Sequence, residues 1–354
     1  MRARSDFFRR LSAVRRVRAG LRGWGGVGAM AVVCVLAVAF VLLLPLTQSR
    51  GEAGADLGGQ RTAQGVQAKA AKCDESTVQD QSPPPSDSDG TTINAIKERG
   101  YLNVGVDQNS YRWGYLNPNS SGELEGFDID LVHAIAKNIF GSSYSPSKVH
   151  LLAIPTDQRI PAVQQKRVDM VVRTMTINCE RAGKVAFSAP YFVTGQQVLA
   201  PKVSTVTGHN NSLADKRVCS AKGSTAYERL DADKTAHTLP ASVDIKDTVP
   251  NQLDCLVKLQ LGETDAVVTD GALAASLAAQ DPTVELKGAA FTTEYYGVAM
   301  NLKATDLVRR VNRVLETYRT DTGPGGWRAS YTKWLLPTLR ADSKSADPPT
   351  PHYK

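Results

Sequence analysis

The sequence has few residues of the kinds that metal centres and nucleophilic enzymes need. Its 354 residues include only five histidines and five cysteines, and the histidines are scattered along the chain. A structural metal site needs such ligands at close spacing, and the chain contains no CxxC pair. It also contains no GxSxG, HExxH or P-loop motif. We therefore expect no metal, no other cofactor and no catalytic residues, and keep an exported enzyme as the least favoured alternative.

The body of the chain has no excess of positive charge. The formal net charge is +7, but residues 1–50 hold nine arginines and one acid, Asp6, whereas the other 304 residues hold 33 basic and 34 acidic side chains. A nucleic-acid-binding domain presents a basic face, so nucleic acid is not an expected partner. A basic tail before an apolar segment is instead typical of the cytoplasmic flank of a membrane span.

That apolar segment, residues 27–46, reads VGAMAVVCVLAVAFVLLLPL and carries no charge. As a helix it is long enough to cross a bilayer. We predict a basic cytoplasmic tail at 1–26, a transmembrane anchor or signal segment at 27–46, and a cell-membrane protein whose C-terminal domain is extracytoplasmic. A cleaved signal peptide, a lipoprotein signal at Cys34 and a twin-arginine signal at Arg9-Arg10 stay open as alternatives.

Two further segments lack apolar periodicity. Residues 47–90 are rich in Gly, Ala, Gln, Ser, Asp and Pro, and residues 341–354 are short and polar. We predict a flexible extracytoplasmic linker at 47–90 and a disordered tail at 341–354. The length between them suits one large domain or two lobes.

From residue 91 to 340, strand and helix patterns alternate. Short apolar runs such as 102–106 are followed by stretches with apolar residues at helical spacing, such as 126–141. This alternation predicts an α/β fold with largely parallel sheets. Ligands bind at the carboxyl ends of such strands, so polar clusters that follow strands directly are expected to share a cleft. Four such clusters occur, at Asp107, 173–176, 222–225 and Thr269-Asp270.

The residue types in and beside these clusters suit an acidic α-amino acid. The guanidinium of Arg181, with a threonine hydroxyl, suits bidentate binding of one carboxylate. Arg173 stands at the end of a buried strand, where an arginine needs an anion, and suits a second carboxylate. Asp270 suits an ammonium group. The ordinary alternatives are a surface charge at Arg181 and a helix cap at Asp270.

Longer motifs between residues 92 and 337 carry a resemblance to a known family. They include GFDIDLVHAIAKNIFG, RIPAVQQKRVDMVVRTMTINCERAGKVAFSAPYF, GETDAVVTD and YYGVAMN. The chain resembles the extracytoplasmic amino-acid-binding proteins of polar amino-acid ABC transporters, bacterial solute-binding family 3. More narrowly, TINCER, RVCSAKGST and PPTPHY are similar to the glutamine/glutamate-binding sensor encoded beside the protein kinase G locus in actinobacteria.

The resemblance implies a type II periplasmic-binding-protein fold, with two α/β lobes and a two-strand hinge around a ligand cleft. Lobe 1 is expected at 91–191 and 297–340, and lobe 2 at 196–292. The implied function is lobe closure on a polar amino acid, for sensing or for ABC uptake. The implied partner is an ABC permease, or a multi-spanning membrane sensor linked to a cytoplasmic kinase. A sensor scaffold that has lost ligand binding is the alternative.

The resemblance also assigns roles to individual residues. The carboxylate-binding arginine falls on Arg181 and its hydroxyl partner on Thr176, while the ammonium-binding acid falls on Asp270. Arg173 replaces a residue that is small in many family members, which favours glutamate or aspartate over glutamine and asparagine. Thr156 replaces an expected aromatic residue. The predicted ligand-binding set is Asp107, Arg173, Thr174, Thr176, Arg181, Lys222, Thr225 and Asp270.

Four cysteines lie outside the apolar segment. An even number in an exported domain indicates two disulfides, and the residues alone leave three pairings open. The family frame places Cys219 and Cys255 in one lobe, and Cys73 beside the loop of Cys179. On that frame we predict the disulfides Cys73–Cys179 and Cys219–Cys255.

Overall fold

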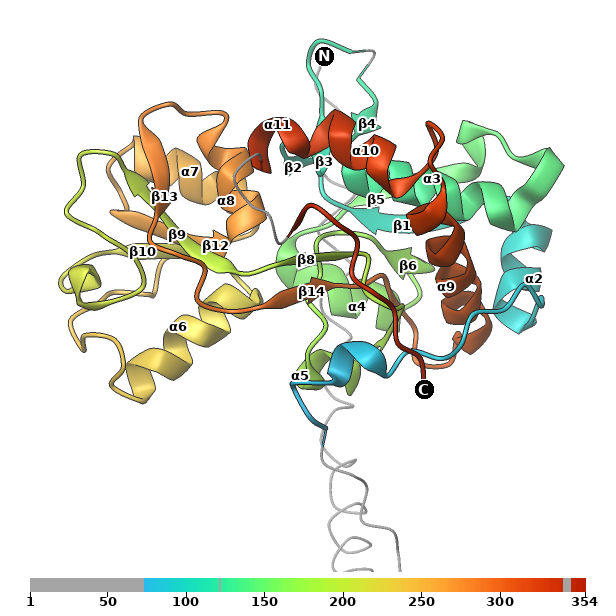
Figure 1. Cartoon of the computed structure of the whole chain (residues 1–354), viewed down its shortest axis with the longest axis horizontal. Coiled ribbons are helices and arrows are strands. Elements are labelled where there is room, and N and C mark those ends of the chain that lie inside the picture. Colours follow the sequence, from blue (N-terminus) through green and yellow to red (C-terminus); the bar gives the residue numbers. More distant parts are fainter. Residues whose placement is uncertain (1–72, 121, 340–344) are drawn as a thin grey trace, which may run out of the picture. The chain divides into compact units, whose positions relative to one another are not determined.

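A computed structural model describes residues 73–354 except 121 and 340–344. Two five-stranded sheets, each covered by helices, form the body of this part of the chain, so the predicted α/β class is confirmed (Figure 1). The predicted membrane segment at 27–46 lies outside the described residues. Within the described residues, no helix has the length and apolar character needed to cross a membrane.

The sheet of lobe 1 has the strand order β5-β1-β6-β15-β7. Its strands are β1 (Leu102–Val106), β5 (Val149–Ala153), β6 (Met170–Val171), β7 (Ala186–Phe187) and β15 (Ala299–Met300). β1 runs parallel to β5 and β6, and β15 runs antiparallel to β6 and β7. The helices of this lobe are α2 (Thr91–Arg99), α3 (Phe127–Phe140), α4 (Arg159–Gln164), α5 (Cys179–Ala182), α9 (Thr305–Thr320), α10 (Trp327–Trp334) and α11 (Leu336–Leu339).

The sheet of lobe 2 has the order β11-β10-β12-β9-β13. Its strands are β9 (Gln196–Pro201), β10 (Val218–Ala221), β11 (Thr248–Val249), β12 (Ala266–Asp270) and β13 (Val284–Lys287). Its helices are α6 (Thr225–Thr235), α7 (Gln252–Gln260) and α8 (Gly271–Ala278). β9 makes this sheet mixed, because it pairs antiparallel to both of its neighbours, β12 and β13.

Two strands connect the lobes. β8 (Phe192–Thr194) and β14 (Glu294–Tyr296) pair antiparallel and run side by side between the two sheets (Figure 1). β8 leads into β9 of lobe 2, which runs antiparallel to its neighbour β12. β14 leads into β15 of lobe 1, which runs antiparallel to its neighbour β6. This explains why the sheets are mixed where the sequence predicts largely parallel pairing.

Shorter elements complete the described part of the chain. β2 (Asn109–Ser110), β3 (Gly114–Leu116) and β4 (Leu124–Glu125) form a three-stranded sheet. Single 3-10 turns occur at Val78–Asp80, Gly141–Ser143, Pro146–Lys148, Thr156–Gln158 and Asn211–Leu213.

The described ends of the predicted linker and tail are packed on lobe 1, which corrects the expectation of a flexible linker up to residue 90 and a disordered tail from 341. We call residues 73–90 the N-terminal strap. Ser82 of the strap forms hydrogen bonds with lobe 1, and its hydroxyl donates to the Phe187 carbonyl at 2.9 Å. Asn312 of α9 donates to the Ser82 hydroxyl at 2.7 Å, and the Lys354 amide donates to the Ser82 carbonyl at 3.0 Å. Such contacts by single polar groups produce no periodic pattern, so the sequence did not reveal them.

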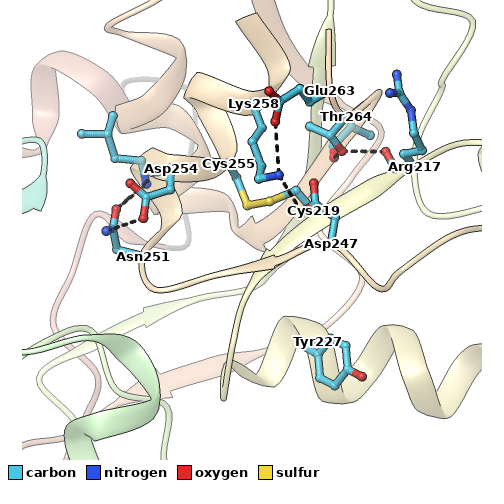
Figure 2. Close-up of a disulfide and its surroundings, with 12 residues drawn as sticks. Arg217, Cys219, Tyr227, Asp247, Asn251, Asp254, Cys255, Lys258, Glu263 and Thr264 are labelled. Atoms are coloured by element: carbon cyan, nitrogen blue, oxygen red, sulfur yellow. Dashed lines mark hydrogen bonds and ion pairs between the residues drawn. A yellow bond between two sulfur atoms is a disulfide. The ribbon is translucent and has the colours of Figure 1, made fainter. Parts of the chain in front are cut away.

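Both predicted cysteine pairs are disulfide-bonded in the structure. Cys73 and Cys179 have a Cα–Cα distance of 5.7 Å, and Cys219 and Cys255 one of 5.6 Å. Figure 2 shows the second bond joining β10 to α7, and both of its cysteines are buried. α7 begins after Asn251, whose side chain accepts from the amides of its first turn.

Candidate functional site

A small polar cavity lies where the carboxyl ends of strands from both lobes meet. Its volume is only about 10 Å³, close to the room that one water molecule needs. Its lining residues are Arg159, Thr174, Thr176, Arg181, Ser224, Thr225, Ala226, Gln252, Thr269 and Asp270. Five residues of the predicted set are among them, and three are not. The three outside the lining are Asp107, Arg173 and Lys222.

Arg181 lies in the cavity on α5 and reaches both lobes. Asn178 accepts from the Arg181 amide at 2.9 Å and so begins this helix. The buried guanidinium donates to the Thr176 carbonyl at 2.9 Å in lobe 1 and to the Gly223 carbonyl at 3.2 Å in lobe 2. Because no described carboxylate forms an ion pair with it, this fork is available to an anionic ligand.

Arg159 is a second buried arginine in the cavity, and it is absent from the predicted ligand-binding set. Its Nε donates to the Thr156 carbonyl at 2.9 Å, whereas its terminal nitrogens reach the carbonyls of Arg173, Thr174 and Gly223 only at 3.3, 3.4 and 3.4 Å. Burial, together with the neighbouring Arg181 and Arg173, lowers the pKa of Arg159 well below its usual value. No described carboxylate forms an ion pair with this guanidinium either.

The sequence carries only part of the signal for Arg159. The stretch 154–159 follows β5, as the four polar clusters follow their strands, but Arg159 is the first residue of a helical stretch, RIPAVQ, and does not stand in a polar cluster. Five residues separate the end of β5 from Arg159, so the sequence does not indicate that Arg159 lies at the carboxyl edge of the sheet.

Arg173 and Asp107, both members of the predicted ligand-binding set, form an ion pair with each other and lie outside the cavity lining. Their Nη2 and Oδ2 atoms are 2.9 Å apart, and both side chains are buried. The strand register explains the contact: Gly105 of β1 pairs with Val171 of β6, so residues two positions later lie side by side. Arg173 also donates to the Thr156 hydroxyl at 3.0 Å. Its anion is therefore a residue of the protein.

Asp270 ends β12 and lies buried in the cavity. Its side chain makes no capping bond to α8, so the ordinary interpretation as a helix cap does not apply. Instead, the Tyr296 hydroxyl donates to Asp270 Oδ2 at 2.5 Å. Burial, reinforced by the nearby carboxylate of Glu294, raises the pKa of Asp270 to about 7. A ligand ammonium group at this place would favour the ionised form.

The remaining predicted residues have different surroundings. Lys222 is exposed and forms an ion pair with Asp157 at 3.5 Å, outside the cavity lining. Thr225 begins α6, and its hydroxyl donates to Glu294 Oε2 at 3.3 Å. Thr174 adopts a left-handed backbone with φ of 42°, and its amide donates to the buried carboxylate of Asp128 at 3.2 Å. That amide is therefore already occupied.

The charges in the cavity lining do not balance. Arg159 and Arg181 contribute two guanidinium groups, and Asp270 contributes one carboxyl group. Around these charges lie the hydroxyls of threonine and serine residues. Among the residues that the structure describes, no group of His, Cys, Asp and Glu side chains could hold a metal ion. The arrangement suits binding of a small zwitterion that carries an additional negative charge.

Two α/β lobes around a polar cavity, joined by a pair of antiparallel strands, define the class of solute-binding proteins. The chain belongs to the bacterial extracellular solute-binding proteins, family 3, whose model matches residues 102–337. This is a family of binding proteins and not of enzymes.

Three similar proteins illustrate the match. The ABC transporter glutamine-binding protein GlnH of Bacillus subtilis is 32% identical over 244 residues, which are 69% of this chain and 84% of that protein. The glutamate-binding protein GluB of Corynebacterium efficiens is 27% identical over 274 residues, 74% of this chain and 86% of that one. A solved ancestral arginine-binding protein bound to glutamine is 33% identical, with a TM-score of 0.59, over 67% of this chain and 98% of its own.

Proposed function

We propose that the protein binds an acidic α-amino acid, aspartate or glutamate, outside the cytoplasmic membrane, with asparagine and glutamine as the second candidates. The observation that carries the proposal is Arg159. This buried guanidinium lines the cavity, and no described carboxylate pairs with it. A zwitterion alone would leave the surplus positive charge of the lining in place, whereas a side-chain carboxylate neutralises it.

In this proposal each ligand group has one main partner. The α-carboxylate binds Arg181, with the Thr176 hydroxyl beside it. The ammonium group binds Asp270. The side-chain carboxylate binds the terminal nitrogens of Arg159, whose bonds to carbonyl oxygens are long at 3.3–3.4 Å. A charge-assisted bond to a carboxylate is shorter and roughly twice as strong, so exchanging these contacts for the ligand is favourable.

Contacts between the lobes support a mechanism of closure on the ligand. The Gly223 carbonyl of lobe 2 accepts from both Arg159 and Arg181 of lobe 1. The Thr156 amide of lobe 1 donates to the Pro250 carbonyl of lobe 2 at 2.9 Å. Two of these three bonds involve the proposed ligand-binding arginines, so ligand binding and the contact between the lobes are coupled.

The names of the relatives agree with a polar amino acid as the ligand, but they differ in whether its side chain is an amide or a carboxylate. GlnH is a glutamine-binding protein and GluB a glutamate-binding protein. Since Arg173 is paired with Asp107, the preference for an acid now depends on Arg159.

We also propose that an N-terminal anchor at 27–46 tethers the protein to the membrane, where it acts in ABC uptake or as a sensor. The sensor role corresponds to the resemblance to proteins of the protein kinase G locus. Gene neighbourhood distinguishes the two: a permease and an ATPase indicate uptake, and a kinase with a multi-spanning membrane protein indicates sensing.

A thermal-shift panel of the twenty amino acids tests the ligand class. A ligand that binds only the folded protein stabilises it by roughly 2.7 kcal/mol at a hundredfold excess over its Kd. We expect aspartate or glutamate to give the largest shift. If none of the amino acids shifts the Tm, the protein is better interpreted as a scaffold that has lost ligand binding, and the proposal is wrong.

A further inference from the structure

The segment that carries Arg181 has little secondary structure of its own to hold it in place. α5 is only four residues long, from Cys179 to Ala182. Helices this short are not stable by themselves. Besides the Asn178 cap and the bond to the Thr176 carbonyl, the orientation of Arg181 therefore depends on contacts with other parts of the chain.

The N-terminal strap supplies such contacts at the first residue of α5. Cys73 is disulfide-bonded to Cys179. Both carboxylate oxygens of Glu75 accept from the Cys179 amide at 3.2 Å. Val78, which is 4% exposed, belongs to the same apolar cluster as Met175 and Ile177. The strap thus holds the segment around Arg181 by a covalent bond, a polar contact and apolar packing.

The strap also faces lobe 2. Glu75 and Gln79 line a polar hollow together with Glu228 of α6. Thr176 and Thr225 line both this hollow and the cavity that contains Arg181, so the two adjoin. The strap therefore lies both at the segment that carries Arg181 and at the place where lobe 2 approaches it.

We propose that Glu75 and the Cys73–Cys179 disulfide are positioning elements of the amino-acid site: they fix α5 so that Arg181 meets the carboxylate of the ligand. This inference rests on the proposed function. It gives the strap a role in affinity, beyond a role in stability, because a preorganised site loses less conformational entropy on binding.

Calorimetry on the full-length chain in detergent, titrated with L-aspartate and L-glutamate, tests the inference. We expect the Cys73→Ser/Cys179→Ser variant to bind about tenfold more weakly. Glu75→Ala should weaken binding severalfold, whereas Glu75→Gln keeps an acceptor oxygen and should retain the wild-type Kd. The matched control is Cys219→Ser/Cys255→Ser. It removes a disulfide within lobe 2, so it should lower the Tm but leave the Kd unchanged.

The possible outcomes separate the two claims. If the Cys73→Ser/Cys179→Ser and Glu75→Ala variants are folded and keep the wild-type Kd, the positioning role is wrong while the proposed function stands. If the double cysteine variant does not fold, the comparison of Glu75→Ala with Glu75→Gln decides. A wild-type chain that binds neither acid, nor asparagine or glutamine, refutes the proposed function itself.

Discussion

Replacing Arg159 with methionine should remove the preference for an acidic side chain. Methionine keeps much of the apolar stem of arginine but removes the charge. Arg159 supplies the surplus positive charge of the cavity, since Arg181 is assigned to the α-carboxylate and Asp270 to the ammonium group. The variant site then holds one cation and one anion, which match a zwitterion with a neutral side chain.

The expected magnitude follows from the bonds that are exchanged. Hydrogen bonds to charged groups contribute about 1.5–3 kcal/mol, so losing this contact should weaken aspartate and glutamate binding by roughly 10- to 150-fold. Asparagine and glutamine should change much less. The folded state should tolerate the change, because burial and two neighbouring arginines already disfavour the charge of Arg159.

The assay is calorimetric titration of the wild type and Arg159→Met with all four amino acids. Lys222→Met is the matched control, because Lys222 is a cation near the cleft that is exposed and outside the cavity lining. Equal losses for acids and amides in Arg159→Met, or the same loss of acid binding in Lys222→Met, would refute the reasoning.

Three further predictions concern Arg181, Asp270 and the buried ion pair. Arg181→Met should weaken all four amino acids by about 1.5–3 kcal/mol in calorimetry, because each has an α-carboxylate; an effect on the acids alone contradicts this. Asp270 has a raised pKa of about 7, so protonation should weaken binding by up to about tenfold per pH unit as the pH falls below 7. Because the pKa of Asp270 is higher in the folded state than in the unfolded state, ionisation of this group lowers the free energy of unfolding as the pH rises from about 4 to 7. Acidification across this range should therefore not destabilise the fold through Asp270, and melting curves recorded in parallel check this. Arg173→Met should lower the free energy of unfolding by about 3–5 kcal/mol in urea, because Asp107 would remain as a buried unpaired charge; a change below about 1 kcal/mol contradicts this.

Much of the fold could be predicted from the sequence because it depends on local patterns. The alternation of apolar strands and amphipathic helices gave the α/β class. The rule that ligands lie at the carboxyl ends of strands located Thr176, Thr225 and Asp270, which the structure brings into one cavity with Arg181.

The partners of the charged residues could not be predicted, because they depend on which strands are neighbours. Asp107 and Arg173 both follow strands and both looked like ligand residues. They pair with each other because β1 and β6 are adjacent, with Gly105 opposite Val171. The distance along the chain gives no indication of this register.

Packing of the strap was missed for a related reason. The Ser82 and Asn312 side chains bond across 230 positions of the chain, and neither lies in a periodic pattern that could signal the contact. A segment rich in proline and serine has the composition of a linker whether or not distant side chains bind its backbone.

The most direct test of the central claim is titration of the wild-type protein with L-aspartate, L-glutamate, L-asparagine and L-glutamine at pH 8, where Asp270 is ionised. The unpaired guanidinium of Arg159 predicts saturable one-site binding, with either acid bound more tightly than its amide. Tighter binding of the amides would contradict the assignment of Arg159 to the side chain, and no binding of any of the four would contradict an amino-acid site between the lobes.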